Sequence, residues 1–187
     1  LMRSLTQACR AICYYTASCL DRGNYGDTPE TSAAWIARGD LMTPIAKAFS
    51  SEVGQDVTAL GIQVHGGMGY VEETGVAQYY RDARIASIYE GTNGIQAIDL
   101  VGRKLALNGG KAIQAFFALV DAECAAAKGD PALADVAGRV EKANGELKAA
   151  TMWFVQNGMT KPNNVGAGAH HYMHIMGIVA LGLMWLR

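Results

Sequence analysis

The spacing of the apolar residues constrains the fold of this chain more than any other feature. Apolar residues recur every three or four positions along most of the 187 residues, as in the run over 43–65 that Gly66 and Gly67 close. Such spacing gathers apolar side chains on one face of an α-helix. Since no segment alternates apolar and polar residues beside a hairpin turn, we expect no strand. The sequence therefore predicts an all-α bundle, or two stacked bundles joined near residues 103–112.

Helix boundaries are expected where capping residues, glycine and proline interrupt this spacing. Thr43 is the expected N-cap of the helix that ends at residue 65, and Pro44 would occupy its first helical position. The other interruptions are segments rich in glycine, asparagine and proline. Further helices are predicted over residues 2–22, 111–128, 132–157 and 165–187, with a turn-rich linker over 21–30.

A helix is also expected to begin directly after Glu90. Thr92 and Asn93 are both good N-cap residues, and the NGG segment at 108–110 would end the helix. Its apolar stripe is predicted to hold Ile95, Ile98, Val101 and Leu105.

Composition excludes several classes of protein. Sixteen basic and seventeen acidic residues give a net charge of −1 without a Lys/Arg-rich run, so no nucleic-acid partner is expected. The most apolar run, at the C-terminus, falls short of the ~20 residues that span a bilayer. The four cysteines form no disulfide framework and favour a reducing compartment. Because both ends break off inside apolar patterns, we expect a piece of a longer chain.

Glu90 is the one acid in the otherwise uncharged run between Arg84 and Asp99. Its neighbours leave two interpretations open. It is either a solvated loop charge or an acid held in an apolar pocket, where desolvation would raise its pKa and suit it to proton transfer. In either case it would precede a helix N-terminus, where free N–H groups and the positive end of the helix dipole lie.

The segment QVHGGMGY, from Gln63 to Tyr70, is a glycine-rich turn. Glycines without β-carbons let a ligand such as a diphosphate approach the backbone closely. A simple helix C-cap followed by a turn explains the same pattern. A Rossmann dinucleotide fold is excluded, because that motif requires a preceding strand.

Together the two segments carry a resemblance. QVHGGMGY, followed by YYRDARIASIYEGTNGIQ over residues 79–96, resembles the C-terminal helical domain of acyl-CoA dehydrogenases. The resemblance implies an up-and-down helical bundle over residues 1–108, truncated at its N-terminus. Residues 109–187 are similar to the helical C-terminal extension of the larger bacterial members and would also be truncated. The N-terminal helical and middle β-domains of the family are absent, so the piece alone is expected to be inactive.

The resemblance also implies chemistry. Glu90 would be the base that removes the α-proton of an acyl-CoA thioester, while a hydride passes to FAD. The backbone N–H of Glu90 would stabilise the charge on the thioester carbonyl. Tyr89 and Gly91 would contact the substrate. Six residues would contact FAD, and the first three of them would reach the FAD of a neighbouring subunit. They are Gln63, Gly66, Gly67, Thr92, Asn93 and Gly94.

Partners and location follow from the same resemblance. It implies a flavoprotein oxidoreductase of fatty acid β-oxidation, a homodimer or homotetramer in the bacterial cytoplasm, that passes electrons to an electron-transfer flavoprotein. Two other functions stay open. One is a helical oligomerisation module without chemistry, and the other is an acyl-CoA oxidase of the same fold.

The HHYMH segment raises the question of a metal site. His170 and His174 share one helical face at a spacing that two zinc ligands can use. No acid lies between them, and no carboxylate or cysteine follows Glu146. We therefore expect no metal site from the sequence.

Overall fold

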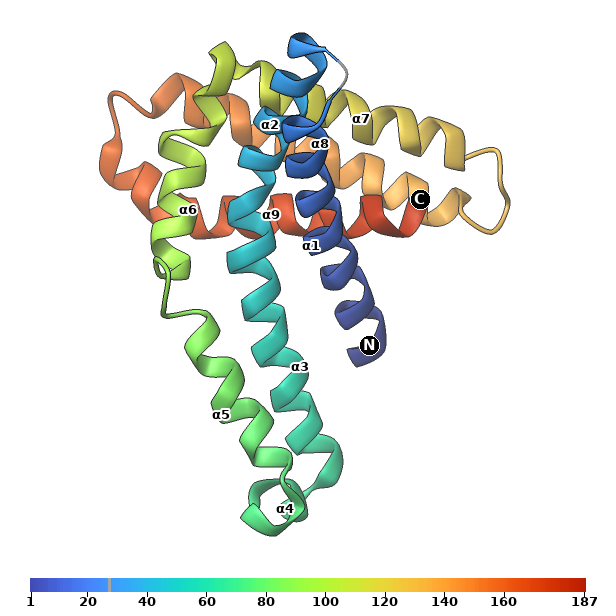
Figure 1. Ribbon diagram of the computed structural model, residues 1–187, viewed down its shortest axis with the longest axis vertical. Helices are drawn as coiled ribbons and strands as arrows, with labels where there is room; N and C mark the ends of the chain where they lie inside the picture. The colour runs from blue at the N-terminus through green and yellow to red at the C-terminus, as the bar shows by residue number, and fades with distance from the viewer. Residues whose placement is uncertain (27) are drawn as a thin grey trace.

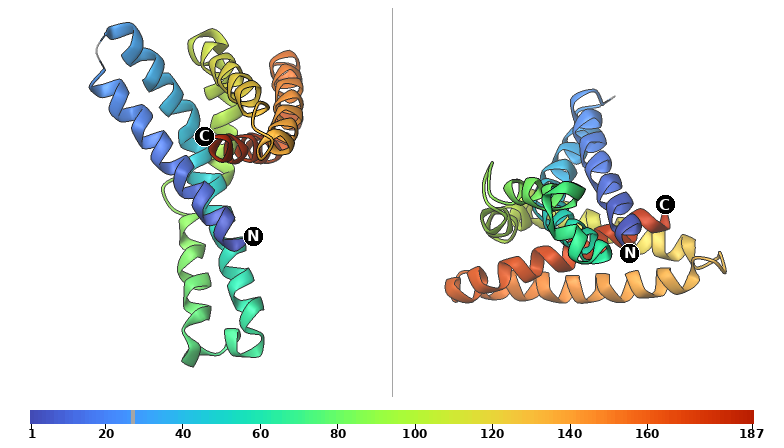
Figure 2. Two further views of the ribbon diagram at one scale, coloured as in Figure 1. Left: turned by 90° about the vertical axis from the view of Figure 1, so that its right-hand side faces the viewer. Right: turned by 90° about the horizontal axis from the view of Figure 1, so that it is seen from below.

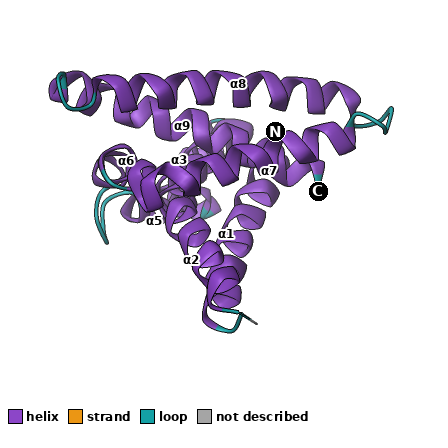
Figure 3. Cartoon of the chain, turned by 90° about the horizontal axis from the view of Figure 1, so that it is seen from above, coloured by secondary structure: helices purple, strands orange, loops and turns teal. Residues whose placement is uncertain are grey.

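The computed structural model describes residues 1–26 and 28–187, and within them it contains helices, turns and loops but no strand. Figure 3 shows the helices and the short loops that join them. The predicted all-α fold is confirmed. Helix α1, Met2–Asn24, covers the first predicted helix and runs slightly beyond it. The predicted linker over 21–30 is therefore shorter than expected, and its residue Asp27 lies outside the described residues.

Helix α2, Pro29–Pro44, begins with a side-chain cap. Thr28 Oγ1 accepts a hydrogen bond from Thr31 N–H, and the Thr31 side chain bonds back to the Thr28 backbone. Pro29 occupies the first turn, where a missing N–H is tolerated. The first Thr-Pro pair of the chain thus begins a helix inside the range predicted as a linker.

The second Thr-Pro pair, Thr43-Pro44, lies inside a helix and does not begin one, so the predicted boundary was wrong. Thr43 Oγ1 donates to the carbonyl oxygen of Gly39 one turn earlier, at 2.8 Å, and so caps nothing. A wider π-helical turn, η1 at Ile45–Phe49, follows the proline that lacks an N–H. Helix α3, Ser50–His65, continues directly, and Figure 1 shows α2, η1 and α3 as one long rod.

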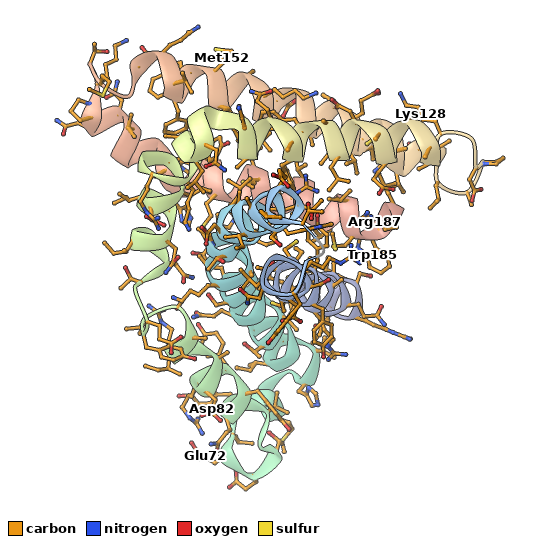
Figure 4. The ribbon with its side chains drawn as sticks, turned by 45° about the horizontal axis from the view of Figure 1, so that its top comes forward. Glu72, Asp82, Lys128, Met152, Trp185 and Arg187 are labelled. Atoms are coloured by element: carbon orange, nitrogen blue, oxygen red, sulfur yellow. The ribbon has the colours of Figure 1, made fainter. Side chains whose placement is uncertain are left out.

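The rod ends at the glycine turn, as predicted. Gly66 has a φ of +58° at the C-cap of α3. The short helices α4, Gly67–Tyr70, and η2, Glu72–Thr74, form the tip of the molecule. Figure 4 shows Glu72 and Asp82 projecting near this tip. Helix α5, Val76–Ala86, then returns alongside α3, and the sequence analysis did not predict it.

Helix α6, Asn93–Gly102, starts where expected but buries a different face. Thr92 caps it, and its buried residues are Asn93, Ala97 and Leu100. Ile95 and Ile98 of the predicted stripe are more than half exposed. The segment η3, Lys104–Gly110, follows and contains three non-helical residues, Leu107, Asn108 and Gly109.

The remaining helices form a layer against the side of the rod, and α9 crosses it near η1 (Figures 1 and 2). They are α7, Lys111–Ala127, α8, Ala134–Asn157, and α9, Pro162–Leu186, close to the predicted ranges. Helix α9 packs against α8, α7, α6 and α1, so its sides are apolar nearly all round. One continuous core joins this layer to α1, α2, η1, α3 and α6.

Candidate functional site

The loop between α5 and α6 passes through two residues in the left-handed region, and Figure 1 shows α6 continuing away from the tip beyond it. Glu90 has a φ of +54° and Gly91 a φ of +80°. A non-glycine residue in this region is disfavoured by about 1–2 kcal/mol, so surrounding contacts must hold it. The side chain of Glu90 is exposed, and Tyr89 beside it is 51% exposed.

Contacts from η1 and α3 hold this loop in place. Lys47 Nζ donates to the carbonyl oxygen of Gly91 at 2.7 Å and to Asn93 Oδ1 at 2.9 Å. Gln55 Nε2 donates to Ser87 Oγ at 2.8 Å. These three supporting residues, Lys47, Gln55 and Ser87, were missed by the sequence analysis. They come from positions more than thirty residues apart from their partners, and no local spacing pattern connects them.

Asn93 is buried at the centre of these contacts, with 6% of its surface exposed. Its Nδ2 donates to Ser51 Oγ at 2.9 Å and lies 3.2 Å from Glu52 Oε1. Its backbone N–H donates to the carbonyl oxygen of Ser87. The side chain and the backbone N–H are therefore both committed to protein partners, which leaves no free donor of Asn93 for the cofactor contact that the resemblance implies.

Donor groups gather around Glu90 at the start of α6. Thr92 Oγ1 accepts from Ile95 N–H at 3.3 Å, which satisfies one N–H of the first turn. Within the part of the chain that the structure describes, the N–H groups of Glu90 and Gly94 make no hydrogen bond. The segment that leads into α6 thus carries an exposed carboxylate, which can accept a proton, and unpaired N–H groups, which can stabilise a negatively charged oxygen.

The second expected group lies elsewhere. Gln63, Gly66 and Gly67 are exposed at the tip, at the other end of α5 from the Glu90 loop. An eleven-residue helix is about 16 Å long, so one chain does not bring the two groups together. His65 in the same turn bonds the carbonyl oxygen of Gly61 through Nδ1 at 2.9 Å, as a helix-end contact.

The fold and the loop define an all-helical domain that presents one glutamate and open backbone donors at the N-terminus of a helix. Comparison with known proteins makes the class specific. The family model described as "Acyl-CoA dehydrogenase, C-terminal domain" matches residues 2–106, and "Acetyl-CoA dehydrogenase C-terminal like" matches residues 112–187. The chain belongs to the acyl-CoA dehydrogenase family.

Individual relatives agree with the family match. The 3-methylmercaptopropionyl-CoA dehydrogenase of Ruegeria pomeroyi is 38% identical over 97% of this chain and 31% of the relative. The caffeyl-CoA reductase-Etf complex subunit CarC of Acetobacterium woodii is 33% identical over 56% of this chain and 24% of that protein. The structure of Caenorhabditis elegans ACDH-11 in complex with C11-CoA shares the fold, with a TM-score of 0.79 at 21% identity. The structural match covers 96% of this chain and 30% of the ACDH-11 chain.

Where nearly the whole chain is matched, it spans about a third of the relative's length, as with the Ruegeria protein and ACDH-11. Among the described residues no helix is long and apolar enough to cross a membrane.

Proposed function

We propose that this chain is the base-bearing C-terminal part of a flavin-dependent acyl-CoA dehydrogenase. Residues 1–108 would form the family's C-terminal bundle, and residues 109–187 its helical extension. The observation that supports this most is the Glu90 loop, which carries an exposed carboxylate and an unpaired N–H directly before α6. Family membership and the helical fold agree with it.

The residues expected near FAD suit a flavin dinucleotide. At Gly66 and Gly67 an added β-carbon would meet nothing within 4 Å, so the backbone is open to a diphosphate. The unpaired N–H of Gly94 adds a donor at the positive end of α6. FAD, when bound, supplies a two-electron acceptor for hydride.

The proposed reaction makes a double bond between the α- and β-carbons of an acyl-CoA thioester. Glu90 would take the α-proton, and the electrons of that C–H bond would form the new bond as the β-hydrogen leaves as hydride; bound FAD would supply the acceptor for this hydride. The N–H of Glu90 donates to the thioester carbonyl and stabilises its developing charge. Tyr89 and Gly91 flank the base and would contact the substrate. Because Glu90 is exposed in this chain, its shielding would come from substrate, flavin and the rest of the protein.

Partners follow from the same proposal. Since the tip and the Glu90 loop are separated, each flavin site would use the loop of one chain and the tip of another, in a homodimer or homotetramer. The name of the Acetobacterium relative includes an Etf complex, which supports an electron-transfer flavoprotein as the electron acceptor. The location proposed is the bacterial cytoplasm.

A purely structural module is the second candidate. It is supported by the exposed apolar face of α6, where Ile95 and Ile98 suit contact with another protein surface. Such a module has no use for a glutamate in the left-handed region, so the Glu90 loop favours the enzyme. An oxidase would use the same loop.

Glu90→Gln tests the proposal. In the flavin-loaded full-length protein, FAD should stay bound, while bleaching of the flavin by an acyl-CoA should slow by about 10²–10⁴-fold because the base is gone. The measurement is stopped-flow absorbance without an electron acceptor. Glu146→Gln, an exposed glutamate on α8, is the matched control and should bleach normally. Equal bleaching by both variants would reject Glu90 as the base.

A further inference from the structure

Two histidines and a distant glutamate form a cluster where α9 crosses α3. His170 and His174 lie one turn apart on α9, with ring centroids 4.5 Å apart. His174 Nε2 is hydrogen-bonded to Glu52 Oε2, and His170 Nδ1 lies 3.8 Å from Glu52 Oε1. The carboxylate missing from the sequence near the histidines is thus supplied by a residue more than a hundred positions earlier.

The cluster borders a cavity of about 380 Å³ between α3, α5 and α9. Asp56 and Arg84 also line it, with the polar side chains of Gln55 and Ser87. With the two histidines counted as neutral, the carboxylates of Glu52 and Asp56 and the guanidinium of Arg84 give the lining of the cavity a formal charge of −1. Arg84 Nη1 donates to Ser87 Oγ at 2.6 Å, which directs the guanidinium toward the loop. This balance favours a cation.

We propose that Glu52, His170 and His174 bind a divalent transition-metal ion such as Zn²⁺. Two histidines and one glutamate are a known donor set for zinc, and imidazole selects such ions over Mg²⁺ or Ca²⁺. One donor atom from each residue lies within 4.8 Å of the other two. In a tetrahedral site the donors would lie about 3.3 Å apart, given metal–nitrogen distances of about 2.0–2.1 Å.

Small side-chain rotations would bring the donor atoms from their present spacing, within 4.8 Å of one another, to the spacing of about 3.3 Å that a tetrahedral site requires. The side chain of His170 is 50% exposed and is therefore free to turn toward Glu52. The fourth ligand position would open onto the cavity, where water or Asp56 can fill it. The ion would join the extension to the first bundle. Because Asn93 Nδ2 lies 3.2 Å from Glu52 Oε1, the ion would also support the loop that carries Glu90.

Metal titration of the full chain tests this inference without reference to activity. The protein, freed of metal with a chelator, is titrated with Zn²⁺ against a chromophoric chelator. One ion per chain should bind, and the thermal midpoint should rise because the ion binds only the folded state. His170→Ala should weaken binding at least tenfold. His171→Ala, which changes an exposed neighbour outside the cluster, should leave it unchanged.

The choice of variant keeps the test independent of folding. His174 packs edge-on against Phe49, with ring centroids 5.7 Å apart, so its replacement also disturbs the core. His170 is exposed and Glu52→Gln keeps the side-chain shape, so these two variants are used, each with a circular dichroism check. Absence of one-to-one binding, or equal affinity in His170→Ala and His171→Ala, would overturn the proposal.

Discussion

At the scale of single residues, the buried amide of Asn93 joins the Glu90 loop to η1 and α3. Its oxygen accepts from Lys47 and its nitrogen donates to Ser51. The left-handed backbone of Glu90 is disfavoured on its own, so these bonds keep the loop in shape. Because its side chain faces the protein interior, Asn93 would hold the loop that carries the proposed base in place without contacting the substrate.

Asn93→Ala should destabilise the chain by about 1–3 kcal/mol, since Lys47 and Ser51 lose a buried partner. The free energy of unfolding, measured by urea denaturation, checks this. Asn163→Ala changes an exposed asparagine at the start of α9 and should stay within about 0.5 kcal/mol of the original chain. A similar small change at both positions would mean that the bonds of Asn93 contribute little.

Tyr172 predicts how stability depends on alkaline pH. Burial raises the pKa of its phenol above the ordinary value near 10, while its hydrogen bond with Thr151 acts in the opposite direction. Above pH about 10 the unfolded chain loses this proton and the folded chain keeps it. Stability should therefore fall as pH rises, by up to about 1.4 kcal/mol per pH unit.

Urea denaturation at several pH values above 9 measures this slope. Tyr172→Phe should flatten it, whereas Tyr14→Phe, at an exposed position, should not. Burial also raises the pKa of Tyr15, so some slope should remain in the first variant. Parallel slopes in the original chain and Tyr172→Phe would contradict the prediction.

At the scale of elements, α9 depends on glycine where it crosses the rod. A β-carbon at Gly177 would overlap the ring of Phe49, whereas one at Gly166 on the same helix would meet nothing within 4 Å. Gly177→Ala should therefore destabilise the chain by about 1–3 kcal/mol through overpacking. Gly166→Ala should stabilise it by about 0.5–1 kcal/mol by restricting the unfolded backbone. Thermal unfolding of the pair measures both, and equal shifts would argue against close packing at Phe49.

Several elements could be predicted from sequence, and the exceptions have physical causes. The helices after residue 110 were predicted well because their apolar stripes face the core, as Phe116 and Leu147 show. The α6 stripe was misassigned because Ile95 and Ile98 are apolar but exposed, and spacing alone does not distinguish a core face from a face that contacts another surface. The predicted helix start at Thr43-Pro44 was wrong because a π-turn accommodates the proline inside a longer helix.

The candidate site was only partly predictable. The sequence indicated Glu90, the Thr92 cap and the glycine turn because each is a local motif. It did not indicate Lys47 or Glu52, because their roles depend on contacts between segments far apart in the chain.

At the scale of the whole molecule, the residues expected at FAD occupy two separate places, and all of them except the buried Asn93 are exposed. Purified alone, the chain should therefore hold little or no flavin. The visible absorbance spectrum after gel filtration with added FAD measures this, with the full-length protein as the positive control. Stoichiometric yellow flavin on the chain alone would show that neither a second domain nor a second tip is needed.

The distance between the glycine tip and the Glu90 loop has a genetic consequence. Under the proposed assembly, a dimer made of one chain altered at Glu90 and one altered at Gly66 would place both defects in one site and neither in the other. Two alleles that each give an inactive protein alone would then restore growth when expressed together, the pattern known as interallelic complementation.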